Sequence, residues 1–395
     1  MPKYIPRQIE GRDVVDNAVD HTAVAESFIH LATAAPTTAN DEGTGYAVGC
    51  LWIDYSNGET YTCIDSTDEG AKWAAQDGSD DINILQMQGS TYGWYASGRF
   101  DPGSPATPGN HNRYSLASSG NGSDIGEANG LIEKGQNGSI RDLSYGFHVM
   151  GYNPGYPDVI DRFPFTAPTG VTDVGEGAPS DGLAQHAGNT SGTYGFVSGG
   201  YNGPPSNALL DEIYTFPLAN PSNPFSDTGG ELTSARTNVF GVSDPINGYG
   251  YVASGDEPSA RNSDAAERFA FVSTGNASDI GEMNTGTIYM TGHSSPTHGY
   301  GCGGSPWPSY PELNTIQKFT LAASTTSADV SEMTEAKGGC RASSGDGFGY
   351  IAGGADVGPS ACKNTIERNS TTADSAGADV GELTEINMMG CATEN

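Results

Sequence analysis

Pairs of Asp and Glu, three or four residues apart, recur along the chain and are the residues with the clearest chemical potential. They begin at Asp124, Asp173, Asp227, Asp279, Asp329 and Asp379. Carboxylate oxygens at such a spacing, together with backbone carbonyls, could bind a hard cation such as Ca²⁺. The candidate ligands are Asp124, Glu127, Asp279, Glu282, Asp379 and Glu382. We favour the alternative that each Asp accepts a backbone N–H within a turn and each Glu faces solvent. No metal or other cofactor is therefore expected.

Other reactive residue types lack the spacing that catalysis or metal binding requires. The seven histidines form no HxH or HExxH pattern, the six cysteines contain no CxxC pair, and no GxSxG motif occurs. These absences disfavour a zinc site of the usual spacing and a hydrolase built on a nucleophile elbow. A pair of catalytic carboxylates cannot be recognised among 48 acidic residues. We expect a protein that is not an enzyme.

One loop could present aromatic side chains to a ligand. The segment from Gly304 to Asn314 contains Trp307, Pro308 and Tyr310. Exposed aromatic rings of this kind can stack on sugar rings. The competing interpretation, which we favour, is that these side chains pack over a neighbouring repeat.

The elements that would position these residues repeat along the chain. A segment of the type aromatic-Gly-aromatic begins at Tyr92, Tyr145, Tyr194, Tyr249, His298 and Phe348, at intervals of 53, 49, 55, 49 and 50 residues. Each copy is followed by an alternating apolar strand, an acidic turn and a short variable strand. Four strands in about 50 residues, repeated six times, predict an all-β fold, a six-bladed β-propeller.

Closing such a ring requires a strand from one end of the chain to complete a blade begun at the other, because an open edge would promote aggregation. We predict that Ile386 to Cys391 pairs into the first blade. Ile82 to Met87 would then serve as an additional leading strand or as a linker.

The repeats resemble those of the kelch-type propeller. The resemblance rests on strands that end in Gly-Gly and on ELTSAR, from Glu231 to Arg236, although the usual Trp of the third strand is replaced by Phe or Tyr. The combination of NTIxxFxF, ADVGELT and YGFVSGG more closely resembles repeats in virion structural proteins of tailed phages, especially marine ones. This resemblance covers residues 82–395.

The N-terminal part has a resemblance of its own. Residues 45–73 look like a small β module of phage tail-fibre and capsid-surface proteins, with Trp52 and Trp73 as its core. A two-residue turn at Asn57-Gly58 would place Cys63 opposite Trp52 and only diagonal to Cys50, too far for a disulfide. We expect an extended arm with a short helix at 22–34 in residues 1–44, the β module with its hairpin in 45–81 and the propeller in 82–395.

The net charge of −31 and the pI near 4.2 argue against a nucleic-acid partner, which requires basic groups. No apolar run is long enough to predict a membrane span. The resemblances imply a structural protein on the exterior of a virion, anchored to capsid or tail proteins through residues 1–80. The alternative is a host-attachment protein whose propeller loops bind a surface glycan or receptor. Association with further copies of the chain remains open.

Overall fold

The computed structural model divides into two compact units, Met1–Ile84 and Leu85–Asn395. It describes residues 29–32, 35–40, 43, 45–54, 59–67, 71–75, 87–96, 110–127, 138–151, 159–166, 171–176, 183–203, 206, 208–221, 225–259, 261–273, 275–308, 311–322, 326–356, 362–387 and 391–394. These residues contain no α-helix, and the predicted all-β fold is confirmed for them. Within the same ranges no helix has the length and hydropathy needed to cross a lipid bilayer.

The first unit contains one four-stranded sheet in the order β1-β2-β3-β4. Its strands are β1 (Ile29–Ala32), β2 (Leu51–Asp54), β3 (Glu59–Asp65) and β4 (Lys72–Ala75). The helix predicted over 22–34 is wrong at its C-terminal end, because Ile29–Ala32 pairs in parallel with β2. The edge of β2 offers this segment backbone partners, and such tertiary pairing overrides helix propensity. Residues 22–28 lie outside the described part of the chain.

The pairing of β2 with β3 differs from the expected hairpin. A loop of four residues connects the strands, because Asp54 lies opposite Glu59. The predicted two-residue turn is therefore wrong, and Cys63 faces Cys50 rather than Trp52: the Cys63 amide donates to the Cys50 carbonyl at 2.8 Å. Both cysteines are nevertheless free thiols.

The core of the first unit is a cluster of aromatic side chains. Trp52 and Trp73 are buried in it, as predicted, and their ring centroids are 5.5 Å apart. The ring of His30 in β1 lies 4.2 Å from that of Trp52. The indole N–H of Trp73 donates to the carbonyl of Asn40 at 3.0 Å, which ties the preceding loop to the sheet.

The described part of the second unit contains six four-stranded antiparallel sheets, which we number I to VI. Sheet I consists of β30 (Cys391–Glu394), β5 (Tyr92–Ala96), β6 (Asn110–Ser115) and β7 (Ser123–Glu127). Sheet II consists of β8 (Ile140–Arg141), β9 (Tyr145–Val149), β10 (Val159–Pro164) and β11 (Thr172–Glu176). Sheet III consists of β13 (Ala187–Thr190), β14 (Tyr194–Ser198), β16 (Glu212–Pro217) and β17 (Ser226–Glu231).

The remaining three sheets follow the same order along the chain. Sheet IV consists of β18 (Phe240–Asp244), β19 (Tyr249–Ala253), β20 (Ala265–Ala270) and β21 (Ser278–Glu282). Sheet V consists of β22 (Thr291–Ser294), β23 (His298–Cys302), β24 (Thr315–Thr320) and β25 (Ala328–Glu332). Sheet VI consists of β26 (Arg341–Gly345), β27 (Phe348–Ala352), β28 (Lys363–Ser370) and β29 (Ala378–Asn387). A separate two-stranded pair joins β12 (Leu183–Ala184) to β15 (Tyr201–Asn202).

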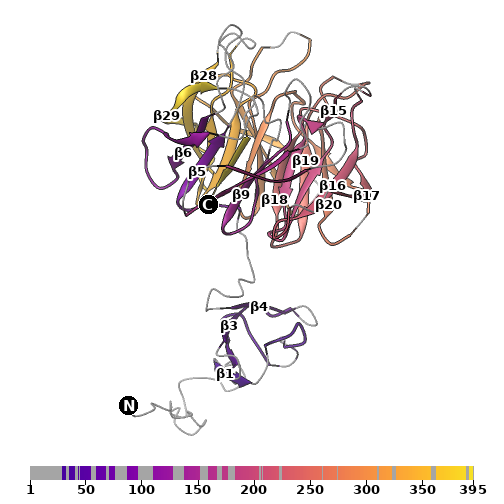
Figure 1. Cartoon of the computed structure of the whole chain (residues 1–395), viewed down its shortest axis with the longest axis vertical. Coiled ribbons are helices and arrows are strands. Elements are labelled where there is room, and N and C mark those ends of the chain that lie inside the picture. Colours follow the sequence, from indigo (N-terminus) through magenta and orange to yellow (C-terminus); the bar gives the residue numbers. More distant parts are fainter. Residues whose placement is uncertain are drawn as a thin grey trace. The chain divides into compact units, whose positions relative to one another are not determined.

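The first strands of neighbouring sheets contact one another, from β8 through β13, β18, β22 and β26 to β30. They therefore line the centre of the unit, and the fourth strands lie at its periphery. Figure 1 shows β6 beside β29, although the two strands are far apart in sequence. The arrangement is β-propeller-like.

A glycine in the second strand lets an aromatic ring lie flat against the backbone. A Cβ atom at Gly250 in β19 would lie 2.4 Å from Cζ of Phe269 in β20. The corresponding glycines of β9 and β23 stand in the same relation to Phe163 and Phe319. This contact explains the glycine in these copies of the aromatic-Gly-aromatic pattern, since no larger residue leaves room for the ring. At Gly349 of β27 the ring that requires glycine is instead that of His293 in β22.

The C-terminal strand lies in sheet I, but it is not the segment predicted. Ile386 belongs to β29, whose Asn387 lies opposite Lys363 of β28. The segment that pairs with β5 is instead Cys391–Glu394. The prediction of Ile386 to Cys391 is wrong because bulges in β29 extend that strand by several residues before the chain crosses to sheet I.

The segment that leads into sheet I runs alongside sheet VI. The amide of Gly89 donates to the carbonyl of Ser344 at 2.7 Å, and Gly89 forms a parallel bridge with Gly345. The side chain of Gln88 donates to the carbonyl of Ser294 at 3.1 Å. Of the predicted leading strand at 82–87, only Met87 belongs to the described residues, and it is buried.

Candidate functional site

Buried polar side chains join neighbouring sheets, most clearly at the junction of sheets III and IV. The carboxylate of Glu267 in β20 accepts the amide of Thr233 at 2.8 Å and its hydroxyl at 2.7 Å. The same carboxylate is ion-paired with Arg236, and both side chains are fully buried. A buried ion pair of this kind is stable only when both charges are also hydrogen-bonded, as they are here.

The same position of the third strand makes this contact at the next two junctions. Gln317 in β24 accepts the amide of Thr285 at 2.9 Å. Glu367 in β28 accepts the amide of Thr334 at 2.6 Å and pairs with Lys337 at 2.8 Å. The acceptor changes between Glu and Gln, and the donating amide belongs to the residue after Leu232 and after Met333 but to the second residue after Met283. The acceptor position of the third strand is therefore what the repeats share.

Sheets VI and I are joined in the same way. Asn112 in β6 accepts the amide of Thr384 at 3.1 Å and its hydroxyl at 2.6 Å. The hydroxyl of Tyr350 donates to the carbonyl of Leu116, directly after β6. At the preceding junction the hydroxyl of Tyr300 donates to the carbonyl of Thr371, directly after β28. The first and last sheets therefore meet through the contacts found between consecutive sheets.

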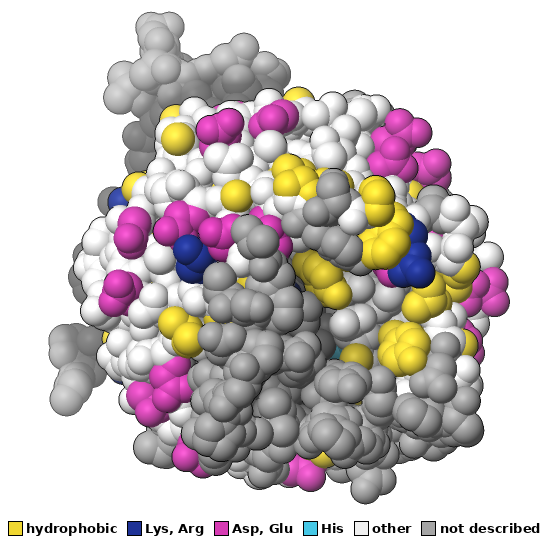
Figure 2. Space-filling model, turned by 90° about the horizontal axis from the view of Figure 1, so that it is seen from above, with side chains coloured by type: hydrophobic (Ala, Val, Ile, Leu, Met, Phe, Trp, Pro, Cys, Tyr) yellow, Lys and Arg dark blue, Asp and Glu magenta, His cyan; other side chains and the backbone are white. Residues whose placement is uncertain are grey.

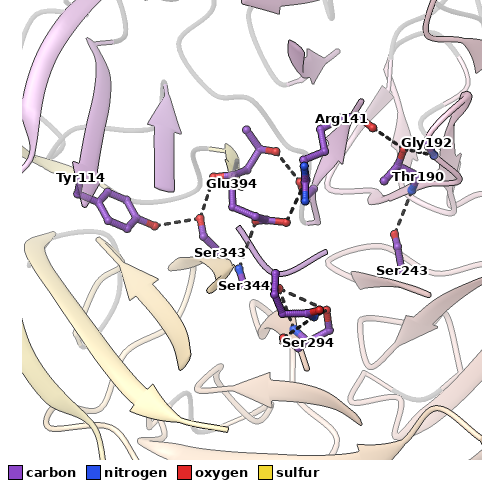
Figure 3. A network of polar contacts seen from close by, with 12 residues as sticks. Tyr114, Arg141, Thr190, Gly192, Ser243, Ser294, Ser343, Ser344 and Glu394 are labelled. Atoms are coloured by element: carbon purple, nitrogen blue, oxygen red, sulfur yellow. Dashed lines mark hydrogen bonds and ion pairs between the residues drawn. The ribbon is translucent and has the colours of Figure 1, made fainter. Parts of the chain in front are cut away.

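A polar network at the ends of the first strands contains the charged pair Glu394 and Arg141 (Figure 3). A carboxylate oxygen of Glu394 lies 3.7 Å from Nε of Arg141, and the other accepts the amide of Ser344 at 3.2 Å. The hydroxyl of Thr190 donates to the carbonyl of Arg141 at 2.7 Å, and its amide donates to the hydroxyl of Ser243 at 3.0 Å. The network thus connects sheets VI, I, II, III and IV.

Burial dominates the ionisation of groups in this interior. It raises the pKa of Glu394 to about 7, although the guanidinium of Arg141 acts in the opposite direction. It lowers the pKa of His111 and of His293 to about 3 and that of His186 to about 4, so these imidazoles are neutral at pH 7. The ring of His111 packs edge-on against Phe163 at 4.4 Å. In this interior the buried titratable groups serve packing and contacts between sheets.

In sheet V, the start of the loop after β23 and the leading segment at Gln88 lie at opposite ends of the strands. Gln88 of the leading segment contacts Ser294, at the C-terminal end of β22. Cys302 ends β23 and lies opposite Thr291, at the N-terminal end of β22. The loop that follows Cys302 therefore leaves the sheet on the face away from Gln88. We call this side the loop face.

Trp307 lies on the loop face, in the loop between β23 and β24, and 39% of its surface is exposed. Its amide donates to the side-chain oxygen of Asn262 at 2.7 Å, and the Asn262 side-chain amide donates to the Trp307 carbonyl at 2.9 Å. The guanidinium carbon of Arg261 lies 5.0 Å from the centroid of the indole ring. Arg261 also pairs with Asp256 at 3.3 Å. Trp307, Arg261, Asn262 and Asp256 form what we call the Trp307 cluster.

Of the three aromatic-loop residues predicted from the sequence, the structure places Trp307 in this cluster and Pro308, also exposed, directly after it. Tyr310 lies outside the described residues. Arg261, Asn262 and Asp256 were not predicted, because they come from the preceding repeat. Arg261 and Asn262 lie in the loop between β19 and β20, and nothing in the sequence indicates that this loop contacts the loop of Trp307.

The acidic candidates lie on three different sheets and are not brought together. Their segments form outer strands with a bulge rather than turns, and Asp124, Asp279 and Asp379 each accept the amide of the glycine two residues later, at 3.0, 2.8 and 3.1 Å. The second acidic residue of each pair, at Glu127, Glu282 and Glu382, is exposed. Across the described ranges, no group of three or more His, Cys, Asp or Glu side chains could hold a metal ion.

No protein-family model matches the chain, and no curated protein sequence is significantly similar to it.

Proposed function

We propose that the six sheets form one closed, six-bladed propeller of the kelch type, and that the chain is a non-enzymatic structural protein on the exterior of a virion. The proposal assigns residues 1–80 to attachment to capsid or tail proteins. The second unit would be displayed as a knob or spike on the particle surface.

Closure is supported by the repetition of contacts at the junction of sheets VI and I. Thr384 and Asn112 reproduce the contact that Thr233 and Glu267 make between sheets III and IV. A chain whose ends met by chance would not be expected to use the same residue positions. With β30 in place, sheet I has no unpaired inner edge to recruit other chains.

A displayed role is supported above all by the opposite placement of the leading segment and the loop face in sheet V. A chain that enters on one face of a rigid body leaves the other face free for display. The described ion pairs of the interior join sheets, which suits a rigid body. The strongly acidic composition keeps such bodies apart in solution and on a particle.

Particles of the source virus provide the test. Antibodies raised against the purified full chain should label washed particles in immunogold electron microscopy, and mass spectrometry should detect the chain in them. A chain lacking residues 1–80 should fold but fail to bind particles that lack the protein. The proposal is wrong if washed particles contain no copies, or if the shortened chain binds them as well as the full chain does.

A second candidate function, host attachment, is favoured by the Trp307 cluster on the loop face. It would be supported if the purified chain blocked adsorption of the virus to its host. Labelling at capsid sites far from the tail, with adsorption unaffected by the purified chain, would instead favour the purely structural role.

A further inference from the structure

We infer that the Trp307 cluster is a binding site for a neutral carbohydrate. The inference specifies the ligand of the second candidate function, but it concerns the purified chain and does not depend on a place in a virion. It rests on the exposure of the Trp307 indole, on the hydrogen bonds that hold the backbone of the surrounding loops, and on the polar side chains around the indole.

Trp307 is the accessible tryptophan of the chain. All four tryptophans lie within the described residues, and Trp52, Trp73 and Trp94 are exposed by only 6%, 3% and 0%. Leaving part of an indole in water has an energetic cost that packing would normally remove. An indole that a loop presents to solvent is suited to stack on the apolar face of a sugar ring.

The loops that carry the cluster are fixed at their bases. Ser305 and Ile288 exchange two backbone hydrogen bonds, at 2.8 and 3.1 Å, two residues before Trp307. Asp256 and Thr237 exchange a similar pair, at 2.7 and 3.0 Å. Together with the two Asn262 bonds, these contacts hold the backbone of the site before any ligand arrives, which lowers the entropy cost of binding.

The groups beside the indole suit sugar hydroxyls. Arg261 supplies N–H donors, Asp256 supplies carboxylate acceptors, and Arg261 also stacks on the indole. The ion pair between them compensates the charge of the guanidinium. The chain has a net charge of −31, and acidic side chains are spread over the face in Figure 2 while basic ones are sparse. Such a surface repels anionic sugars and leaves neutral ones as the favoured class.

A protein partner is the less favoured occupant. A stable protein interface buries about 800 Å² on each side around an apolar centre. The exposed large apolar side chains of the described residues belong to separate elements: Val48, Leu143, Tyr194, Ile246, Val272, Trp307 and Ile386. A single aromatic side chain ringed by Arg, Asn and Asp resembles a sugar subsite more than the centre of a protein interface.

The test uses acrylamide quenching of tryptophan fluorescence in the full chain, because the quencher reaches Trp307 in preference to the three buried indoles. Neutral oligomers of glucose, galactose, mannose and N-acetylglucosamine are titrated, with sialyllactose as the anionic comparison. At least one neutral oligomer should protect the fluorescence in a saturable manner. By calorimetry, Trp307→Ala should weaken its binding about tenfold or more, and Arg261→Ala should also weaken it.

Val272→Ala is the matched control, since Val272 is 95% exposed but lies at the end of β20 away from Asn262. It should bind as the unchanged chain does. The inference is overturned if no neutral oligomer protects the fluorescence, if only sialyllactose does, or if binding persists in Trp307→Ala. It is also overturned if a purified protein partner protects Trp307 and no sugar does.

Discussion

At the scale of single residues, the glycines of the second strands are required by contact with aromatic rings. A Cβ at Gly250 would lie 2.4 Å from the Phe269 ring. Gly250→Ala should therefore lower the free energy of unfolding by about 1–3 kcal/mol, because the ring or the strand must move. Urea denaturation of the two proteins measures this difference.

Gly275 provides the control for that substitution. A Cβ there would have no heavy atom nearer than 3.6 Å, and its backbone is not in the left-handed region. Gly275→Ala should change stability by less than about 0.5 kcal/mol. Equal effects of the two substitutions would show that the ring contact is not what requires glycine.

Glu394 gives the interior a pH dependence of known sign. Its pKa rises from 4.5 in an unperturbed carboxyl group to about 7 in the fold, so the folded chain binds the proton more tightly. Its contribution to stability is present below pH 4.5 and is lost as the pH rises toward 7. The buried histidines, whose pKa values are lowered, act with the opposite sign: their contribution is present above pH 6.5 and is lost as the pH falls from 6.5 to about 3 or 4.

Comparison with Glu394→Gln isolates the carboxyl group, because both proteins share the histidines. The stability of the unchanged chain relative to the variant should fall between pH 5 and pH 8, by up to about 3 kcal/mol. Chemical denaturation at a series of pH values measures this difference. A difference that does not vary with pH would contradict the assignment.

At the scale of the elements, the ion pair of Glu267 and Arg236 can be exchanged for the uncharged pair of the next repeat. Glu267→Gln alone leaves the buried guanidinium of Arg236 without its carboxylate and should cost about 3–5 kcal/mol. Gln317 and Thr287 occupy the equivalent positions one repeat later. The double variant Glu267→Gln with Arg236→Thr should therefore recover most of the loss in thermal denaturation.

The control for this exchange is Arg236→Thr alone. It leaves the buried carboxylate of Glu267 without its guanidinium partner and should also be strongly destabilising. If the double variant is as unstable as the sum of the two single variants, the two side chains do not act as a unit.

The strands of the repeats could be predicted because the same pattern recurs in all six copies. The aromatic-Gly-aromatic pattern around Gly250 predicts the second strand, and the alternation of apolar and polar residues after it predicts the third. The register of β2 and β3 could not be predicted, because Asn57-Gly58 favours a two-residue turn and nothing in the sequence marks a loop of four. The role of Glu267 was also missed, since its position in the third strand looks like a solvent-facing one until the loop of the previous sheet covers it.

At the scale of the whole molecule, the acidic outer strands protect the periphery as well as contributing to the net charge. The carbonyl of Glu231 in β17 accepts the amide of Ala277, directly before β21 of the next sheet. Across the junction of sheets VI and I, the carbonyl of Glu382 accepts the amide of Gly122, directly before β7. The outer edges are thus partly bonded within the molecule, and exposed carboxylates flank them. Both features oppose edge-to-edge association.

We propose that β30 closes the ring of sheets, and thermal unfolding of a chain that ends at Asn387 would reveal whether it does. Without β30, the inner edge of β5 is unpaired and the buried Arg141 loses Glu394. The midpoint of unfolding should fall by about 10 °C or more, since each kcal/mol lost shifts it by several degrees. Backbone amides of β5 should at the same time lose protection from hydrogen exchange. A midpoint within about 2 °C of that of the full chain, with the β5 amides still protected, would contradict closure by β30.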